Sequence, residues 1–262
     1  MAHQSLMDRV DQLHLPWDNL PAESQPRESF CGCQAPRPED LSHIEKRPHP
    51  AKFSEGIVET MAQLLSDRPG CVFDPFAGTG DLRRLESLGD WCVHTVEYEP
   101  EWAVWDPLTW LGDARILPFE SGRFPVIATS PTYGNGLGQR RHYSNAAGKG
   151  KRYSYPDFLA RDMTPGNTGA VRWGSEYREL HELAWCEQVR ILAPGGRLLL
   201  NFRDSLKKGV LQPISGWHVK TLCSFGLTFI GAAAVGTPGM RMGKGNNPLG
   251  SGEVIFVFDK GE

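Results

Sequence analysis

Residues 71 to 80 constrain the fold of this chain more than any other stretch. They read Cys-Val-Phe-Asp-Pro-Phe-Ala-Gly-Thr-Gly, a short apolar run that ends in a turn of small residues. This pattern predicts a β-strand that enters a tight ligand-binding loop containing Phe76. Gly78 and Gly80 lack the side chains that would hinder a sharp turn or the close approach of a ligand.

The acidic residues of this loop indicate what kind of ligand it binds. Asp74 and Asp81 stand at its two ends, and no Lys follows the glycines. A loop that binds a pyrophosphate would avoid carboxylates beside the anion. A cationic or hydroxyl-rich ligand fits better, and S-adenosylmethionine carries an ammonium group, a sulfonium centre and a ribose. We therefore expect this cofactor, the alternative being a Gly-rich turn without a ligand.

Two further acidic residues follow at positions that suit such a cofactor. Residues 91–98 read as a second strand, and Glu97 comes 23 residues after Asp74. The end of a second strand lies beside the end of the first, so Glu97 is predicted to bind the ribose hydroxyls. Asp113, within Gly112-Asp113-Ala114, could accept a hydrogen bond from the adenine amino group.

A third motif, Ser130-Pro131-Thr132-Tyr133, follows another predicted strand. With the motifs above, it makes the chain resemble the S-adenosylmethionine-dependent DNA amino-methyltransferases that modify adenine-N6 or cytosine-N4. The family motif is Asp/Asn/Ser-Pro-Pro-aromatic, so Thr132 departs from it and removes the geometry that a second proline fixes. The resemblance implies that Ser130 and the Pro131 carbonyl accept hydrogen bonds from the target amino group, while Tyr133 stacks on the base.

The resemblance also assigns a role to His49-Pro50-Ala51-Lys52-Phe53, which precedes the first strand. In the family this segment packs against the methionine end of the cofactor, so His49 and Phe53 become cofactor-binding candidates. Without the resemblance, the same residues would read as a surface turn and a core Phe. Apolar residues at helical spacing follow, and they predict a helix that starts near Ser54.

Strands and helices alternate along the chain, which predicts an α/β fold with a Rossmann-like, doubly wound and mostly parallel sheet of about seven strands. The strands are expected near 71–76, 91–98, 110–116, 125–130, 197–204, 227–235 and 253–259, with a helix over 175–193. The resemblance implies the class I methyltransferase fold, in which the last strand is antiparallel. We expect a Pro-interrupted lead-in over 1–45 and one catalytic domain over 46–262.

Two basic segments are predicted to contact nucleic acid. The net charge of −3 provides no overall attraction to a polyanion, so a binding surface has to be local. Residues 134–174 are too long for an ordinary connection and combine cations with aromatic side chains, as phosphate contact and base stacking require. The alternative is a solvated loop. The candidates, with two from the Gly-rich loop 237–252, are Arg140, Arg141, Lys149, Lys151, Arg152, Arg241 and Lys244.

The six cysteines are scattered, and no run is apolar and long enough to span a bilayer. We therefore expect reduced thiols, a cytoplasmic location and a prokaryotic or viral origin. Cys31-Gly-Cys33 has no second Cys/His pair at ligand spacing, so no metal site is expected.

The sequence thus predicts a methyltransferase that acts on an exocyclic amino group of a DNA base, as in restriction-modification systems. Adenine-N6 and cytosine-N4 stay equally open as targets. An RNA amino-methyltransferase is an alternative, since such enzymes use a similar turn. A catalytically inactive nucleic-acid-binding protein of the same fold is another, because Thr132 departs from the motif.

Overall fold

A computed structural model of the 262-residue chain describes residues 43–134, 137–138, 154–204, 206–207, 210–235 and 253–262, and two short strands over 27–28 and 34–35. The predicted nucleic-acid contacts Arg140, Arg141, Lys149, Lys151, Arg152, Arg241 and Lys244 lie outside the described residues, as do Cys31 and Cys33.

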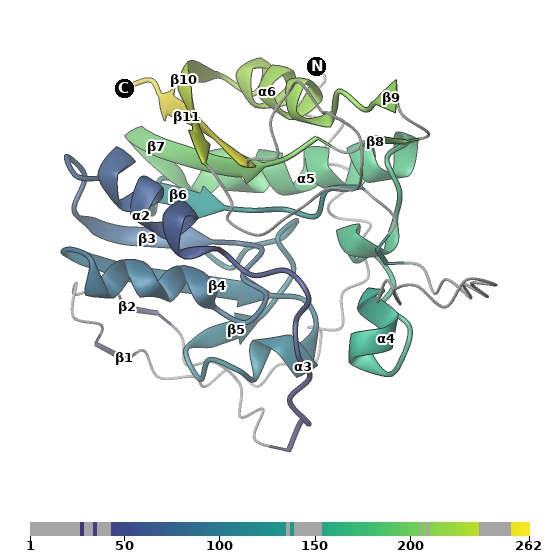
Figure 1. Cartoon of the computed structure of the whole chain (residues 1–262). Coiled ribbons are helices and arrows are strands. Elements are labelled where there is room, and N and C mark those ends of the chain that lie inside the picture. Colours follow the sequence, from purple (N-terminus) through teal and green to yellow (C-terminus); the bar gives the residue numbers. More distant parts are fainter. Residues whose placement is uncertain are drawn as a thin grey trace.

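Seven strands form one sheet, in the order β10-β11-β7-β6-β3-β4-β5 (Figure 1). Their bounds are β3 Gly70–Asp74, β4 Trp91–Glu97, β5 Thr109–Leu111, β6 Phe124–Thr129, β7 Leu192–Phe202, β10 Leu227–Val235 and β11 Glu253–Lys260. Two small hairpins accompany the sheet: β1 Arg27–Glu28 with β2 Gln34–Ala35, and β8 Leu206–Lys207 with β9 Val210–Leu211.

The strand directions match the architecture predicted from the sequence. Strands β3 to β7 pair in parallel, whereas β11 pairs antiparallel with both β7 and β10. The α/β class, the seven strands and the antiparallel last strand are therefore confirmed. In such a sheet the carboxyl ends of the parallel strands share one edge, where ligands bind.

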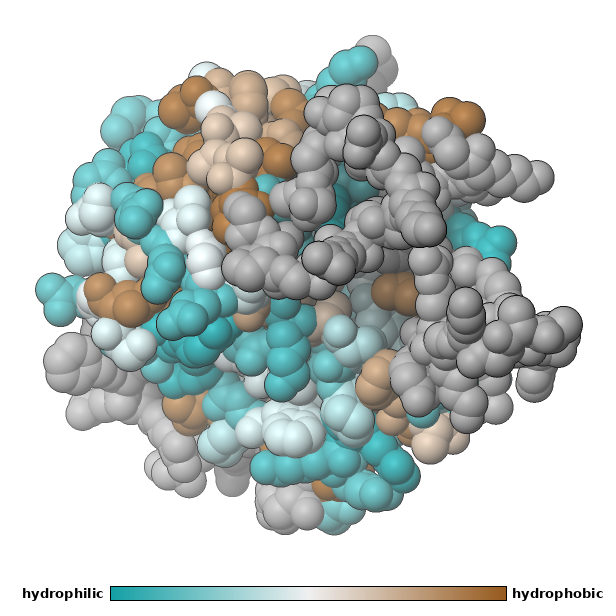
Figure 2. Space-filling view, in the orientation of Figure 1, coloured by the Kyte–Doolittle hydropathy of each residue, from teal (hydrophilic) through white to brown (hydrophobic). Residues whose placement is uncertain are grey.

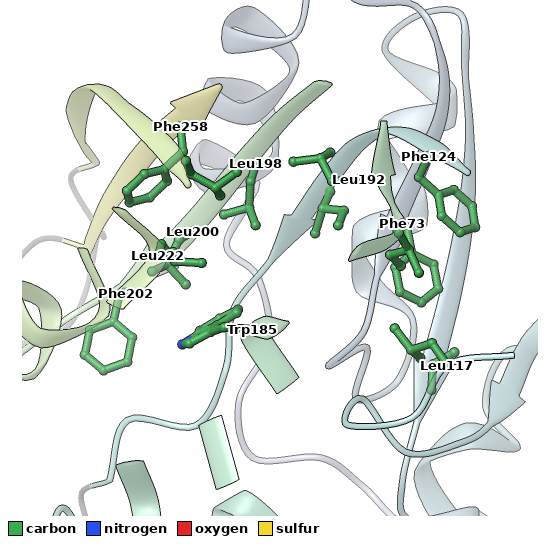
Figure 3. Close-up of a cluster of buried hydrophobic side chains, with 14 of the residues drawn as sticks. Phe73, Leu117, Phe124, Trp185, Leu192, Leu198, Leu200, Phe202, Leu222 and Phe258 are labelled. Carbon is green, nitrogen blue, oxygen red and sulfur yellow. The ribbon is translucent and has the colours of Figure 1, made fainter. Parts of the chain in front are cut away.

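Helices cover both faces of the sheet, with α2 Glu55–Leu64 and the 3₁₀ helix η1 Asp81–Ser87 on one face and α5 Ser175–Ile191 and α6 Ile214–Ser224 on the other. The remaining helices are α3 Pro100–Ala103, α4 Tyr155–Leu159 and the 3₁₀ helix η2 Thr168–Ala170. Alternate strand residues serve the two faces, because successive side chains of a strand point to opposite sides. Val72 belongs to the buried cluster of α2, whereas Phe73 belongs to the cluster of α5 and α6. Figure 3 shows Trp185 of α5 in the second cluster.

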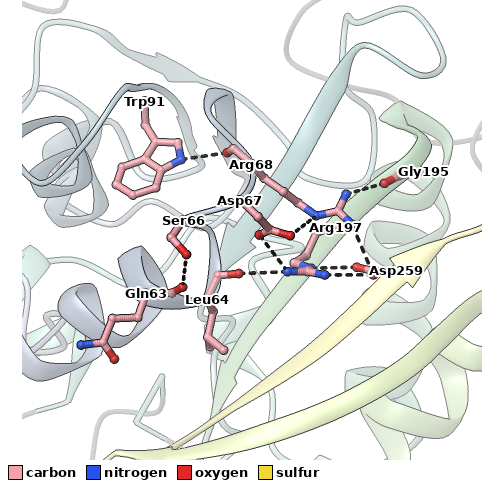
Figure 4. A network of polar contacts seen from close by, with 9 residues as sticks. All are labelled: Gln63, Leu64, Ser66, Asp67, Arg68, Trp91, Gly195, Arg197 and Asp259. Atoms are coloured by element: carbon pink, nitrogen blue, oxygen red, sulfur yellow. Dashed lines mark hydrogen bonds and ion pairs between the residues drawn. The ribbon is translucent and has the colours of Figure 1, made fainter.

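At the amino ends of the parallel strands, ion pairs connect β7, β11 and the segment after α2 (Figure 4). Arg197 of β7 contacts Asp259 of β11 through two nitrogens, at 2.8 and 3.0 Å. The same guanidinium donates to the carbonyl of Leu64 at 3.0 Å. This paired geometry makes the antiparallel register of β11 specific, in addition to the apolar packing.

Two local features differ from the sequence predictions. Helix α5 ends at Ile191 and β7 begins at Leu192, before Pro194, whereas the helix was expected to reach 193 and the strand to begin at 197. Cys71 is disulfide-bonded, so the prediction that all cysteines are reduced is wrong for this residue, while Cys92, Cys186 and Cys223 carry thiols.

Apolar side chains gather near the top of the surface in Figure 2, where Figure 1 places β10, α6 and β9. Exposed large hydrophobic residues of these elements include Phe229 and Ile230 of β10 and Val210 and Leu211 of β9. Among the described residues, no helix is long and apolar enough to cross a membrane, and no cluster of side chains has metal-ligand geometry.

Candidate active site

A cavity of about 530 Å³ opens at the carboxyl edge of the parallel strands. Its walls come from the loop after β3, the ends of β4, β6 and β7, the segment before α2, the start of β11 and the segment around α4. Predicted site residues that line it are His49, Phe53, Phe76, Gly78, Glu97, Asp113, Ser130, Pro131 and Tyr133. Its size suits a nucleoside-sized ligand.

Glu97 connects the end of β4 to the Gly loop. Its two carboxylate oxygens accept hydrogen bonds from the backbone amides of Gly78, at 2.7 Å, and Glu99, at 2.8 Å. Burial raises the pKa of Glu97 to about 8. A carboxylate has further lone pairs beyond these two bonds, so Glu97 can still accept from ribose hydroxyls.

Asp74 and Gly80 do not line the cavity. Asp74 is fully buried beneath the loop, where one oxygen accepts from the Thr129 hydroxyl at 2.6 Å and from the Phe76 amide at 3.1 Å. Burial raises the pKa of Asp74 to about 7. Asp74 therefore connects β3 to β6 and shapes the loop from below. Gly80 adopts a left-handed conformation with φ of 80° before η1.

Aromatic rings form one wall of the cavity. His49 lies edge-on to Trp102 with ring centroids 4.3 Å apart, and it stacks on Tyr155 at 5.7 Å. Burial lowers the pKa of His49 to about 4, so the imidazole is neutral at physiological pH. The sequence predicted His49 and Phe53 here, whereas Trp102 and Tyr155 were missed because no local motif marks them.

Asp113 lies in the cavity wall but is already paired. Arg115 approaches both of its carboxylate oxygens, at 2.6 to 3.0 Å, and both side chains are nearly buried. The Arg115 backbone amide adds a bond of 2.9 Å. This pairing leaves Asp113 few acceptor positions, so its contact with an adenine amino group stays a prediction.

The Ser130-Pro131-Thr132-Tyr133 turn faces the same cavity from the end of β6. The Ser130 and Tyr133 hydroxyl oxygens are 3.1 Å apart, and the Tyr133 hydroxyl donates to Glu253 at 3.1 Å. Asn201 Nδ2 lies 2.5 Å from the same Glu253 oxygen and 3.3 Å from Ser130 Oγ. Burial and the charge of Glu253 raise the pKa of Tyr133, which keeps its hydroxyl protonated.

A buried chain of hydrogen bonds holds Thr132, the residue that replaces the family proline. Trp185 Nε1 donates to His218 Nδ1 at 3.0 Å, so His218 Nε2 carries the proton and donates to the Tyr177 hydroxyl at 3.0 Å. Tyr177 in turn donates to the Thr132 carbonyl at 2.5 Å. The Thr132 hydroxyl contacts Thr168 at 3.2 Å. Tertiary hydrogen bonds thus constrain the turn that lacks its second proline.

The described part of the basic segment 134–174 packs against the cavity. Arg161 pairs with Glu99 at 2.6 Å and with Glu101 at 2.5 Å. Asn167 and Thr164 also donate to buried Glu99. Arg161 therefore neutralises acidic residues of the protein, and residues 154–170 form a wall of the site rather than a free loop.

No family model matches the sequence, and a search of curated proteins found no match. Solved structures do match. One is a 1,6-didemethyltoxoflavin-N1-methyltransferase from Burkholderia thailandensis with bound S-adenosylhomocysteine, 14% identical over 78% of this chain and 77% of that one, with a TM-score of 0.46.

Another is the N-methyltransferase NodS from Bradyrhizobium japonicum with S-adenosylhomocysteine, 12% identical over 85% and 97% of the two chains, with a TM-score of 0.45. A candidate DNA modification methylase from Thermus thermophilus is 18% identical over 58% of this chain and 51% of its own, with a TM-score of 0.36. Similarity at this level leaves function to be inferred from the site.

The site brings together most of the residues predicted from the sequence, and besides Trp102 and Tyr155 it adds two polar residues that were missed. Asn201 is the penultimate residue of β7 and Glu253 is the first residue of β11, and both are almost completely buried beside the Ser130–Tyr133 turn. Neither lies in a recognisable motif. Asn201 interrupts the continuous apolar run Leu198-Leu199-Leu200 near the carboxyl end of a predicted strand, and this was the signal that could have identified it.

Proposed function

We propose that this protein is an S-adenosylmethionine-dependent methyltransferase that acts on an exocyclic amino group of a DNA base. The main support for the proposal is that two sequence motifs line the same cavity. The Gly78 loop of β3, bonded to Glu97, and the Ser130 turn of β6 open onto the same space from neighbouring strands. A methyl donor and an amino acceptor could therefore meet there.

The chemistry of the cavity wall fits this cofactor. Glu97 offers acceptor positions to the ribose, while neutral His49 and Tyr155 offer aromatic surfaces. The Gly78 backbone turns at φ of 56°, and a Cβ there would lie 3.3 Å from His49. The absence of a side chain at Gly78 thus leaves space in the cavity beside His49. S-adenosylmethionine, when bound, supplies a methyl group on an electron-poor sulfonium.

The turn after β6 suits an amino group as the acceptor. The lone pair of an exocyclic amine is delocalised into its ring, so transfer requires alignment and hydrogen-bond acceptors that localise the pair on nitrogen. Ser130 Oγ and the Pro131 carbonyl can provide those acceptors, and the Tyr133 ring lies in the cavity for stacking. The turn has no cysteine, so the carbon-5 methylation of cytosine is not expected.

Mass spectrometry of nucleosides tests the proposal. The purified protein is incubated with methyl-labelled S-adenosylmethionine and either DNA or RNA, and the polymers are then digested. Labelled N4-methylcytosine or N6-methyladenine from DNA is the expected product. Label in RNA alone would favour the RNA alternative, and 5-methylcytosine would contradict the mechanism. The absence of label in both, with cofactor bound, would favour an inactive binding protein.

The Tyr133→Ala variant tests the turn separately from the cofactor site. Loss of the ring removes the stacking surface, which should raise the activation free energy of methyl transfer by roughly 3 kcal/mol. We therefore expect the transfer rate to fall below about 1% of the parent rate. Calorimetric affinity for S-adenosylmethionine should stay unchanged. Substantial turnover by this variant would assign base stacking to another residue.

A further inference from the structure

A buried carboxylate, Glu253, lies in the cavity beside the Ser130-Pro131-Thr132-Tyr133 turn. The turn itself contains no carboxylate. Glu253 is the first residue of β11, it lines the cavity and it is 8% exposed. The register of β11 against β7 places it beside the end of β7, because Ile255 pairs with Asn201 and Val254 with Phe202. The antiparallel last strand thus delivers an acidic side chain to the carboxyl edge of the parallel strands.

The partners of Glu253 are neutral. One of its oxygens accepts from Asn201 Nδ2 at 2.5 Å and from the Tyr133 hydroxyl at 3.1 Å. Among the residues that the structure describes, no Lys, Arg or His forms an ion pair with it. Glu253 thus lines the cavity without a guanidinium of any described residue on its oxygens, whereas Arg115 contacts both oxygens of Asp113. Arg203 lines the same cavity.

A second buried group next to Glu253 has an unused hydrogen-bonding position. Asn201 is 1% exposed, and its Oδ1 has no hydrogen-bond partner within the described part of the chain. Its Nδ2 has three acceptors, Glu253, Ser130 and Tyr133, which assigns the orientation of the amide. A buried acceptor without a partner costs free energy, and an N–H group of a bound substrate would satisfy it.

The chemistry of transfer requires a proton acceptor at this place. When the amino nitrogen attacks the methyl carbon, it becomes positively charged and has to release a proton. Ser130 can accept a hydrogen bond, but a neutral hydroxyl is a poor base. Glu253 is close, since Asn201 Nδ2 contacts both Glu253 and Ser130 Oγ.

We propose that Glu253 is the catalytic base for methyl transfer, and that Asn201 orients it. The nitrogen lone pair forms the new N–C bond while the C–S bond breaks, and the bonding pair of that bond stays on sulfur, which becomes a neutral thioether. A proton moves from the charged nitrogen to the Glu253 carboxylate and then to water. Ser130 and the Pro131 carbonyl hold the amino group in place during the step. This role rests on the proposed amino-methyltransferase function.

The test compares the parent with Glu253→Gln, Glu253→Asp and the matched control Glu59→Gln, which makes the same charge change on the exposed side of α2. Single-turnover transfer to DNA is measured from pH 5 to 9 at saturating S-adenosylmethionine, so that the pH dependence of cofactor binding through Glu97 does not enter the rate. Calorimetric cofactor affinity and thermal unfolding are measured for each variant. We expect Glu253→Gln to slow transfer by about 10²- to 10⁴-fold and to abolish the acidic limb of the pH profile. Its cofactor affinity should stay within about twofold of the parent, since the base acts only on the acceptor.

Glu253→Asp keeps the carboxylate on a shorter side chain, so it should recover part of the rate and the acidic limb. Glu59→Gln should behave as the parent. A transfer rate of Glu253→Gln within about threefold of the parent, or a slow rate with an unaltered pH profile, would overturn the role of Glu253 alone. Absence of transfer to DNA and RNA by the parent itself would overturn the proposed function and this inference together.

Discussion

At the scale of single residues, two buried carboxyl groups beside the Gly loop have strongly raised pKa values. Burial raises the pKa of Glu97 to about 8 and that of Asp74 to about 7. The folded protein thus holds protons that the unfolded chain releases near pH 4. The two protonated carboxyl groups contribute fully to the stability of the folded protein below about pH 4, and this contribution is lost as the pH rises through 7 to 8.

The variant Glu97→Gln should therefore be less sensitive to pH than the parent. Without ligand, the parent is expected to lose stability between pH 5 and 9, and the amide variant should lose less because it has no proton to release there. Thermal unfolding across this range measures the difference. The control Glu59→Gln should follow the parent, and equal slopes for Glu97→Gln and the parent would contradict the raised pKa.

Glu97 should also couple cofactor binding to pH. Ribose hydroxyls and a cationic ligand favour the carboxylate form, so binding releases a proton from Glu97. Affinity for S-adenosylmethionine is expected to rise between pH 6 and 8, by up to about tenfold per unit for one proton. Calorimetry should show that Glu97→Ala removes this rise and weakens binding by roughly 1–3 kcal/mol. Unchanged affinity would remove Glu97 from the site.

Gly78 provides a third residue-scale prediction. Its φ of 56° is a left-handed conformation, and a Cβ would lie 3.3 Å from the His49 ring. Gly78→Ala should destabilise the fold by about 1–2 kcal/mol and weaken cofactor binding. Gly216, within α6, has open space around its Cβ position, so Gly216→Ala should instead stabilise the protein by about 0.5–1 kcal/mol. Denaturant unfolding distinguishes the two, and equal effects would refute the strain argument.

At the scale of elements, α5 and α6 hold the Ser130–Tyr133 turn in position. The chain from Trp185 through His218 and Tyr177 to the Thr132 carbonyl crosses from α5 to α6 and back before it reaches the end of β6. Burial lowers the pKa of His218 well below its usual value, so its ring remains neutral. Each group in this series of hydrogen bonds therefore keeps its role as donor or acceptor. The two helices thus supply the constraint that a second proline gives the family.

Tyr177→Phe should test this constraint, because it removes only the hydroxyl of a fully buried ring. The Thr132 carbonyl and His218 Nε2 then lose a partner, so we expect a destabilisation of about 1–3 kcal/mol. Methyl transfer should decrease by at least tenfold at unchanged cofactor affinity. Tyr98→Phe, which removes a more exposed hydroxyl bonded to Pro165, is the control for stability. An unaltered transfer rate in Tyr177→Phe would show that the turn keeps its geometry without the chain.

At the scale of the whole molecule, a net charge of −3 leaves recognition of a polyanion to local basic segments. Replacement of Arg140, Arg141, Lys151 and Arg152 by Gln should weaken DNA binding and reduce the slope of log affinity against log salt concentration. Cofactor affinity should not change. Fluorescence anisotropy at several salt concentrations measures the slopes, and equal slopes for variant and parent would show that this segment contacts no phosphate.

Local patterns determined the strands, the Gly loop, the Glu97 position and the Ser130 turn, because each depends on a few neighbouring residues and on the alternation of apolar side chains. The parallel order then required these loop ends to share one edge of the sheet. Only the tertiary structure brought Glu253 to Asn201, 52 residues away, through the antiparallel register of β11. It also paired Arg161, which lies within the basic segment 134–174, with Glu99. Burial and charge pairing arise from contacts between distant segments, and no local spacing encodes them.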